Sequence, residues 1–331
     1  MKHVQLSEEW IHGAVSLERR GSGLKPWRIP YADYELYPPD GIGGKAEICA
    51  GIRLRFQTDS LFITLKFEPL TEGARIDCMA DGNFVGTADL AAGEMEAAWT
   101  DLPSGRKVVE IWLPQNIGMT LTVLLLDADA YAEPAPDTRP KWITYGSSIT
   151  QCVAADSPAQ TWPSIASSIG GLNLTCLGYS GNCQMEPMVA RLIRDLPADI
   201  ISLCLGINIY GAESLSARAL KSSVIGMLEI IREKHRNTPL LLISPIFASE
   251  REATPNKLDL TVSFIREEIA EVAALLRNRG DQNLYYRDGR EWFSEADAVH
   301  LSDGLHPDAQ GYKLLGERFR GRMLEGVVLN S

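Results

Sequence analysis

Two residues near the C-terminus have the types and the spacing of a catalytic pair. The run LSDGLHPDAQGY places Asp303 three residues before His306, in a loop that contains glycine and proline. One backbone turn can bring the carboxylate against one imidazole nitrogen, which leaves the other nitrogen free to take a proton from a hydroxyl. The pair is therefore a candidate general base that needs a nucleophile. A capped turn beside a solvated histidine, or half of a metal site, are the alternatives.

The candidate nucleophile is Ser148, in the run WITYGSSITQC. It follows a short apolar segment, and Gly146 permits a tight turn before the helix that Ser148 would begin. Backbone N–H groups and the helix dipole at that position stabilise an oxyanion that forms on an attacked carbonyl. The alternative is that Ser147 or Ser148 caps the helix, which is a common role of serine. The serine motif alone does not separate the two.

Two further loops contain candidate oxyanion donors. In LGYSGNC, Gly181 would let a backbone N–H approach a substrate oxygen, and in CLGINIYG, Asn208 would offer its side-chain amide to the same oxygen. Taken separately, a glycine in a turn and an asparagine in a loop or cap explain both residues. Four such signals at the ends of strands of one sheet favour a common site.

The elements that must position these residues lie in the second part of the chain. Five short apolar runs alternate there with segments of helical spacing, and the runs cover residues 142–145, 172–177, 200–205, 240–243 and 284–286. Such alternation is typical of βαβ units, so it predicts a parallel five-stranded sheet with helices on both faces. Ligands in that α/β architecture bind at the carboxyl ends of the strands.

In the first part of the chain, the apolar residues recur with a different period. Up to about residue 130, apolar residues alternate with polar ones, as in Ile52, Leu54 and Phe56, which indicates short antiparallel strands in a β-sandwich. The segment YAEPAPDTRP contains three prolines and suits an extended connection. We therefore expect an all-β sandwich domain over residues 1–132, a linker over 133–140 and a catalytic domain over 141–331.

The four motifs together resemble those of the SGNH (GDSL-like) hydrolases. The runs GSSIT, YSGN, LGIN and DGLHP occur in the order in which that family has its blocks, across residues 141–324. The resemblance implies a flavodoxin-like fold, with a jelly-roll-like sandwich before it. It implies Ser148 as nucleophile, His306 as base, Asp303 as the acid that orients the base, and an oxyanion hole formed by Gly181, Asn208 and the Ser148 amide.

Two positions depart from the family pattern. Ser147 stands where relatives have the aspartate before the nucleophile, and Ile209 stands where an aspartate often follows the asparagine. Proton transfer requires neither residue, so we expect catalysis to survive. The departures favour a branch of GSSIT-type two-domain members, similar to carbohydrate esterases with an N-terminal sandwich, over the secreted lipases.

Composition and charge exclude several classes of function. A formal net charge of -11 argues against nucleic-acid partners, because binding to nucleic acids depends on lysine and arginine at the phosphates. No signal-peptide pattern and no span of about 18 apolar residues occur, so we expect a cytoplasmic protein without a membrane partner. The remaining histidines and six cysteines show no metal-ligand spacing, so we expect neither metal nor cofactor. A homo-oligomer is possible, and the sequence does not decide the oligomeric state.

The sequence thus predicts a serine esterase that hydrolyses small acyl esters, acetyl esters above all, of carbohydrates or related metabolites. Trp27, Tyr179 and Tyr210 are candidate substrate-binding residues, and core packing is the alternative for Trp27. An acyltransferase that uses the same acyl-enzyme is the second hypothesis. A carbohydrate-binding protein without catalysis is the third, and the complete set of five site residues argues against it.

Overall fold

A computed structural model of the chain describes residues 1–327. By its internal contacts the chain divides into two compact units, of which the N-terminal unit comprises residues 1–35, 39–139 and 156–160. The C-terminal unit comprises residues 36–38, 140–155 and 161 onward. Each unit therefore includes a short segment that lies apart from the rest of it in sequence. In one of these segments, the Ala159 amide donates to Asp77 Oδ2 at 2.7 Å.

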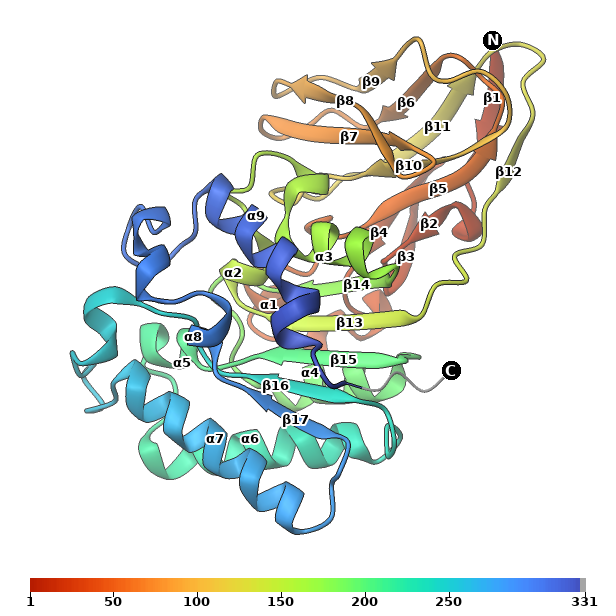
Figure 1. Cartoon of the computed structure of the whole chain (residues 1–331). Coiled ribbons are helices and arrows are strands. Elements are labelled where there is room, and N and C mark those ends of the chain that lie inside the picture. Colours follow the sequence, from red (N-terminus) through yellow and green to blue (C-terminus); the bar gives the residue numbers. More distant parts are fainter. Residues whose placement is uncertain (328–331) are drawn as a thin grey trace. The chain divides into compact units, whose positions relative to one another are not determined.

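The N-terminal unit consists of two antiparallel sheets (Figure 1). The first sheet has the order β3-β4-β11-β6-β9, and β1 also pairs with β11. Its strands are β1 (Lys2–Gln5), β3 (Ser16–Arg20), β4 (Gly23–Trp27), β6 (Ile63–Phe67), β9 (Glu96–Trp99) and β11 (Leu121–Leu126). The second sheet has the order β12-β5-β10-β7-β8, and β2 also pairs with β5. Its strands are β2 (Ile11–His12), β5 (Arg53–Thr58), β7 (Ala74–Ala80), β8 (Asn83–Leu90), β10 (Lys107–Trp112) and β12 (Ala132–Pro134).

The period-two pattern of this region explains the sandwich. In β5, the alternate residues Leu54 and Phe56 are fully buried in the apolar core, which the two sheets share. Asp81 and Gly82 join β7 to β8 with positive φ values of 48° and 78°, as a two-residue hairpin turn requires. The helical segments described in this unit are short, and the backbone of α1 (Asp40–Gly43) is irregular, with positive φ at Gly41 and Ile42. The prediction of an N-terminal β-sandwich is confirmed.

The C-terminal unit is built on one parallel sheet with the strand order β14-β13-β15-β16-β17. Its strands are β13 (Lys141–Gly146), β14 (Asn173–Gly178), β15 (Ile200–Cys204), β16 (Leu240–Ile243) and β17 (Leu284–Arg287). In chain order this is the 2-1-3-4-5 arrangement of flavodoxin-like sheets, whose ligands bind at the point where the strand order reverses. All five apolar runs form the strands that the sequence predicts, and the fold class is confirmed.

The helices of this unit pack in two groups, α3 with α9 and α4 with α6 and α7, and Figure 1 shows α9 and α7 on opposite sides of the sheet. They are α2 (Ser148–Gln151), α3 (Trp162–Gly170), α4 (Pro187–Asp195), α5 (Ile207–Ala212), α6 (Ala217–Arg232), α7 (Val262–Asn278), α8 (Gly289–Trp292) and α9 (Ala309–Arg318). The helical spacing in the sequence marks the buried side of α6 and α7, as for Leu220, Val224, Ile265 and Ile269.

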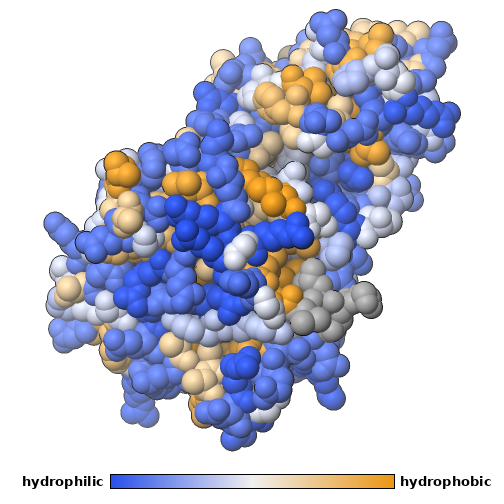
Figure 2. Space-filling model, viewed as in Figure 1, coloured by the Kyte–Doolittle hydropathy of each residue, from blue (hydrophilic) through white to orange (hydrophobic). Residues whose placement is uncertain are grey.

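The face of the molecule seen in Figure 2 is largely polar. Figure 2 shows hydrophilic residues over much of the visible face of each unit, in keeping with the excess of acidic residues. Within residues 1–327, each helix is too short or too polar to cross a bilayer.

Candidate active site

The carboxyl ends of β13, β14 and β15 meet at one edge of the parallel sheet, and Ser148, Gly181 and Asn208 lie in the segments that follow them. Close packing at this edge depends on glycine. A Cβ atom at Gly178, the last residue of β14, would lie 2.4 Å from the backbone nitrogen of Gln151 in α2. A Cβ atom at Gly146, the last residue of β13, would lie 2.2 Å from Thr150 Oγ1. Both glycines therefore let the strand ends approach the single turn of α2.

The two serines at the start of α2 have different partners. Ser147 is the N-cap, and its Oγ accepts a hydrogen bond from the Ile149 amide at 3.2 Å. Ser148 is the first helical residue, and its Oγ lies 2.8 Å from His306 Nε2. The capping alternative that the sequence left open thus applies to Ser147, which leaves the Ser148 hydroxyl for the histidine.

The Asp303 carboxylate holds His306 from two sides. Its Oδ2 lies 2.6 Å from His306 Nδ1, and its Oδ1 accepts the His306 backbone N–H at 2.7 Å. Oδ1 also accepts the Leu305 amide at 2.9 Å. Partial burial raises the pKa of Asp303, but the hydrogen bonds from His306 and Leu305 outweigh this and lower the pKa to about 2. The carboxylate is therefore ionised at neutral pH and can fix the histidine tautomer.

The other nearby histidine has a different role. His300 Nδ1 lies 3.4 Å from Asp308, and Asp308 is the N-cap of α9, where its Oδ1 accepts the Gly311 amide. Of these two histidines, His306 is the one that lies against Ser148. Among residues 1–327, no three His, Cys, Asp or Glu side chains gather as metal ligands would.

Gly181 lies in the loop after β14, and Asn208 lies in the first turn of α5, which follows β15. The Asn208 Oδ1 accepts the Cys183 amide at 3.0 Å, so the side-chain Nδ2 is the group left to donate to a ligand. Gly181 has a φ of 74°, which is favourable for glycine and strained for other residues. In the part of the chain that the structure describes, the Ser148 amide, the Gly181 amide and Asn208 Nδ2 have no protein acceptor.

A buried tyrosine anchors the loop between β14 and α4. The Tyr145 hydroxyl, at the end of β13, accepts the Met185 amide at 3.2 Å and donates to Glu186 Oε2 at 3.1 Å. Burial raises the pKa of Glu186. The loop that contains Gly181 is therefore tied to the same strand that leads to Ser148.

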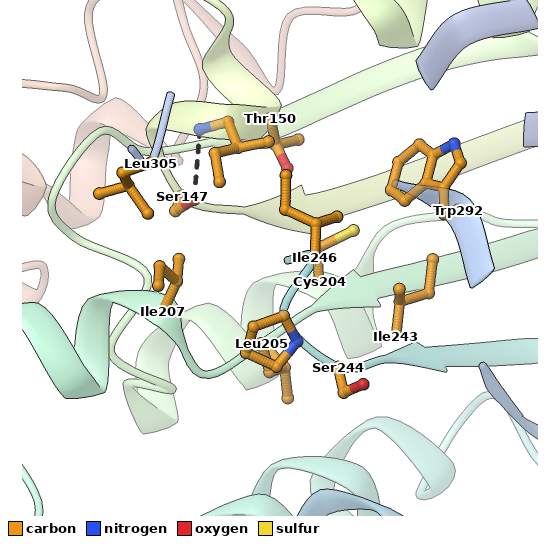
Figure 3. Close-up of a pocket in the computed structure, with 12 residues that line it drawn as sticks. Ser147, Thr150, Cys204, Leu205, Ile207, Ile243, Ser244, Ile246, Trp292 and Leu305 are labelled. Atoms are coloured by element: carbon orange, nitrogen blue, oxygen red, sulfur yellow. Dashed lines mark hydrogen bonds between the residues drawn. The ribbon is translucent and has the colours of Figure 1, made fainter. Parts of the chain in front are cut away.

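A narrow apolar pocket lies beside the segments that carry Ser148, Asn208 and His306 (Figure 3). Its volume is about 20 Å³, which is room for about one water molecule. Ile149, Ile207 and Leu305, the sequence neighbours of Ser148, Asn208 and His306, contribute to its wall. In the view of Figure 3, Ile207 and Leu305 lie at one end of the pocket and Trp292 at the other.

The family model described as GDSL-like Lipase/Acylhydrolase matches residues 140–321, more than half of the chain. The chain belongs to the GDSL-like lipase/acylhydrolase family. This confirms the resemblance to the SGNH hydrolases that the four sequence blocks predict. A second model, the N-terminal domain of SsfX3, matches residues 10–122. Among curated proteins, none matches the chain.

Several solved structures are similar to this GDSL-like protein over their whole length. A salicylyl-acyltransferase from a tetracycline biosynthetic pathway, SsfX3, is 33% identical with a TM-score of 0.92, and the match covers 99% of each chain. A putative GDSL-like lipase from Bacteroides ovatus is 22% identical with a TM-score of 0.79, covering 100% of this chain and 99% of the other. A family two carbohydrate esterase from Clostridium thermocellum is 11% identical with a TM-score of 0.70, covering 97% and 98%. The last two show the fold alone.

The three predicted substrate-binding residues lie in different surroundings. Trp27 belongs to the N-terminal unit, where its ring stacks on Tyr31 with a centroid distance of 5.0 Å and its Nε1 donates to Glu18. This is the packing that the sequence left as the alternative, and a role for Trp27 in substrate binding stays a prediction. Tyr179 is fully buried against Tyr145, so a contact with substrate would require the surrounding loops to move.

Tyr210 lines an open polar hollow in the C-terminal unit of this GDSL-like protein. Its hydroxyl donates to the Thr254 carbonyl at 3.1 Å. Arg251, which lines the same hollow and donates to the Gly304 carbonyl at 3.1 Å, was not among the residues predicted from the sequence. The run SERE around it is polar and without period, so it reads as an ordinary solvated loop. Only the fold brings this loop beside Asp303.

Proposed function

We propose that the protein hydrolyses small acyl esters through a covalent acyl-serine intermediate. The observation that carries the proposal is the continuous chain from Ser148 Oγ through His306 to Asp303, with distances of 2.8 Å and 2.6 Å. Such a chain lets a neutral imidazole take the serine proton while the carboxylate stabilises the imidazolium that forms. Family membership supports ester hydrolysis or acyl transfer as the class of reaction.

In the first half of the proposed reaction, His306 Nε2 removes the proton of Ser148 as Oγ attacks the ester carbonyl. The carbonyl oxygen becomes an oxyanion, and the amides of Ser148 and Gly181 together with Asn208 Nδ2 donate to it. These donors have no protein acceptor among residues 1–327, so they are available to stabilise the charge as it develops. Protonated His306 then gives its proton to the alcohol, which leaves as the acyl-serine forms.

In the second half, after the alcohol has left, a water molecule takes its place beside His306 and acts as the nucleophile. His306, neutral again, takes a proton from the water as its oxygen attacks the acyl-serine carbonyl. The same donors hold the second oxyanion, and the proton returns to Ser148 Oγ as the carboxylic acid leaves. Every proton that moves in the cycle therefore passes through His306, and Ser148 ends with the proton that it had at the start.

The size of the apolar pocket supports acetyl esters as substrates. Ile149, Ile207 and Leu305 bring its wall next to the three polar groups of the site, and about 20 Å³ is enough for a methyl group. A longer acyl chain would have to displace packed side chains, which costs free energy. Acetyl esters are therefore the leading substrates of the proposal, with carbohydrates or related metabolites proposed as the alcohol part.

Substitution of Ser148 tests the proposal. The S148A variant should lose hydrolysis of p-nitrophenyl acetate, and a fluorophosphonate should label the wild-type protein on Ser148. S147A should still be labelled, because the Ser147 Oγ accepts a hydrogen bond from the Ile149 amide and is not the oxygen that lies against His306. S222A, which changes an exposed serine of α6 that donates to the Ala219 carbonyl, should retain full activity. Full hydrolysis by S148A would contradict the proposal.

Acyl transfer to an alcohol is the second candidate function. The full-length match to a salicylyl-acyltransferase, at 33% identity, favours it specifically. Both reactions share the acyl-serine and differ in whether water or an alcohol attacks it. The ratio of free acetate to transfer product, measured with phenyl acetate and added alcohol acceptors, distinguishes them. Turnover by either route would also eliminate the third hypothesis, a carbohydrate-binding protein without catalysis.

A further inference from the structure

An open hollow of about 460 Å³ lies beside the residues that hold His306. Its wall includes Asp303 and Gly304, from the turn that precedes His306. Polar side chains supply much of the remaining wall: Tyr210, Ser249, Glu250, Arg251 and Thr254. It differs from the narrow pocket of Figure 3, whose wall is mostly apolar.

The segment that carries Arg251 is firmly held. It is the short 3₁₀ helix η4 (Ser249–Glu252), and its last residue, Glu252, makes a two-pronged ion pair with Arg266 of α7 at 2.8 Å for both bonds. Arg266 is 3% exposed, and it also donates to the Pro245 carbonyl. Bidentate pairs of this kind fix geometry as well as adding energy. Arg251 is therefore presented to the hollow from a fixed support.

Among residues 1–327, the Arg251 side chain makes one hydrogen bond, and its acceptor is uncharged. Its guanidinium donates to the Gly304 carbonyl at 3.1 Å, and within residues 1–327 it has no carboxylate partner. Gly304 follows Asp303 directly and has a φ of 72°, so it belongs to the tight turn that sets Asp303 against His306. A guanidinium has five N–H donors, so most of the donors of Arg251 stay available to a ligand in the hollow.

We propose that Arg251 is a positioning residue that braces the Asp303–His306 turn from inside the subsite for the alcohol part of the ester. The proposal rests on the proposed function, because it takes Ser148 as the site of acylation. One guanidinium then serves two purposes. It fixes the turn through Gly304, and it donates to oxygen atoms of the alcohol, whose leaving oxygen takes its proton from His306.

The charges around the hollow decide the chemical class of the alcohol. Glu250 and Asp303 line it together with Arg251, so an anionic alcohol would meet two carboxylates and a cationic one would meet the guanidinium. A neutral alcohol with further hydroxyl groups suits all three, because its oxygens accept from Arg251 and its O–H groups donate to Glu250. The hollow therefore favours esters of neutral polyhydroxy alcohols over esters of simple aryl or alkyl alcohols.

A comparison of two acetate esters can distinguish a contact between Arg251 and the alcohol from a purely structural role of Arg251. Glyceryl monoacetate carries free hydroxyls on the alcohol side, and phenyl acetate carries none. In R251M, we expect the KM for glyceryl monoacetate to rise about tenfold, the effect of one lost charged hydrogen bond, while the KM for phenyl acetate stays within about twofold. The kcat for both esters should fall about three- to tenfold because the turn is no longer braced. R251K should recover part of the kcat.

A matched control is available in the same unit. Arg320 is exposed and donates to the Ile169 carbonyl at 3.2 Å, so R320M also removes one bond from a guanidinium to a main-chain carbonyl, away from the triad. It should leave both esters unaffected. Equal changes in R251M and R320M, or an R251M variant that loses kcat/KM equally on both esters without recovery in R251K, would overturn the proposal.

The proposal can fail separately from the proposed function. If wild-type protein turned over neither ester and a fluorophosphonate did not label Ser148, the proposed function would be wrong, and the role of Arg251 would fall with it. If Ser148 were labelled, the labelling rate would report on the turn directly. An unchanged rate in R251M would then overturn the role of Arg251 while leaving the proposed function in place.

Discussion

The Asp303 carboxylate binds both the ring and the backbone of His306, at 2.6 Å to Nδ1 and at 2.7 Å to the main-chain nitrogen. The separation of three residues makes this double contact possible, because a turn of that length brings the residue-306 amide back over the side chain of residue 303. The same carboxylate therefore sets the direction of the loop and the orientation of the ring within it.

Replacement of Asp303 by Asn should keep the turn but weaken catalysis. An asparagine oxygen can still accept from the backbone amides of Leu305 and His306, whereas the neutral amide cannot stabilise an imidazolium. We expect kcat/KM for p-nitrophenyl acetate to fall by about 10² to 10⁴. Circular dichroism should show an unchanged fold. Activity within threefold of the wild type would contradict the assigned role of Asp303.

Replacement of Asn208 by Asp tests the oxyanion donors without disturbing the loop. The new carboxylate keeps the oxygen that accepts the Cys183 amide, and it exchanges the Nδ2 donor for an acceptor. Loss of one such donor costs about 10² to 10³ in kcat, and the added negative charge should increase the loss. The midpoint of urea unfolding should stay close to that of the wild type. A variant with normal kcat would exclude Asn208 from the oxyanion hole.

Much of this arrangement follows from the sequence, because two periodic patterns dominate it. The hydrophobic pattern has a period of two residues in the first part of the chain, which predicts the sandwich. In the second part, short apolar runs alternate with helical spacing, which predicts all five parallel strands. The motifs of Ser148, Gly181 and Asn208 directly follow three of these strands, so they come to one edge of the sheet, since parallel strands end on the same side.

Other features depend on contacts that no local pattern encodes. Which of Ser147 and Ser148 caps α2 is decided by the backbone direction at the end of β13, and either serine suits a cap. Tyr179 follows a buried strand and is itself fully buried, although its place beside a motif loop made it a candidate for substrate binding. Arg251 reaches Gly304 across 53 residues of sequence, and its surroundings have no periodicity to mark it.

Replacement of Gly178 by Ala should disturb α2 and therefore Ser148. The added methyl group would lie 2.4 Å from the Gln151 nitrogen and 2.6 Å from the Thr150 carbonyl carbon, and neither is a flexible side-chain end that can move aside. We expect a loss of about 1 to 3 kcal/mol in the free energy of unfolding, as for other overpacked sites, and a lower kcat. Urea unfolding and ester hydrolysis measure the two effects.

Gly226 in α6 provides the matched control for that substitution. Nothing lies within 4 Å of a Cβ atom built there, so G226A should raise the free energy of unfolding by about 0.5 to 1 kcal/mol through helix propensity. Its kcat should equal that of the wild type. If G178A were as stable and as active as G226A, the close approach of β14 to α2 would be wrong.

His12 should make the stability of the N-terminal unit depend on pH. Burial, and then the charge of Arg53, lower the pKa of His12 from 6.5 to about 4. Between these two values the unfolded chain binds a proton that the folded chain does not, so the free energy of unfolding falls as the pH falls from about 6.5 to about 4. H12Q should remove this part of the pH dependence. The difference in unfolding free energy between pH 7 and pH 5, from urea titrations, should be smaller in H12Q by on the order of 1 to 2 kcal/mol. H3Q, at an exposed position of β1, should leave the difference unchanged, and an equal effect of the two variants would contradict the burial of a neutral imidazole at His12.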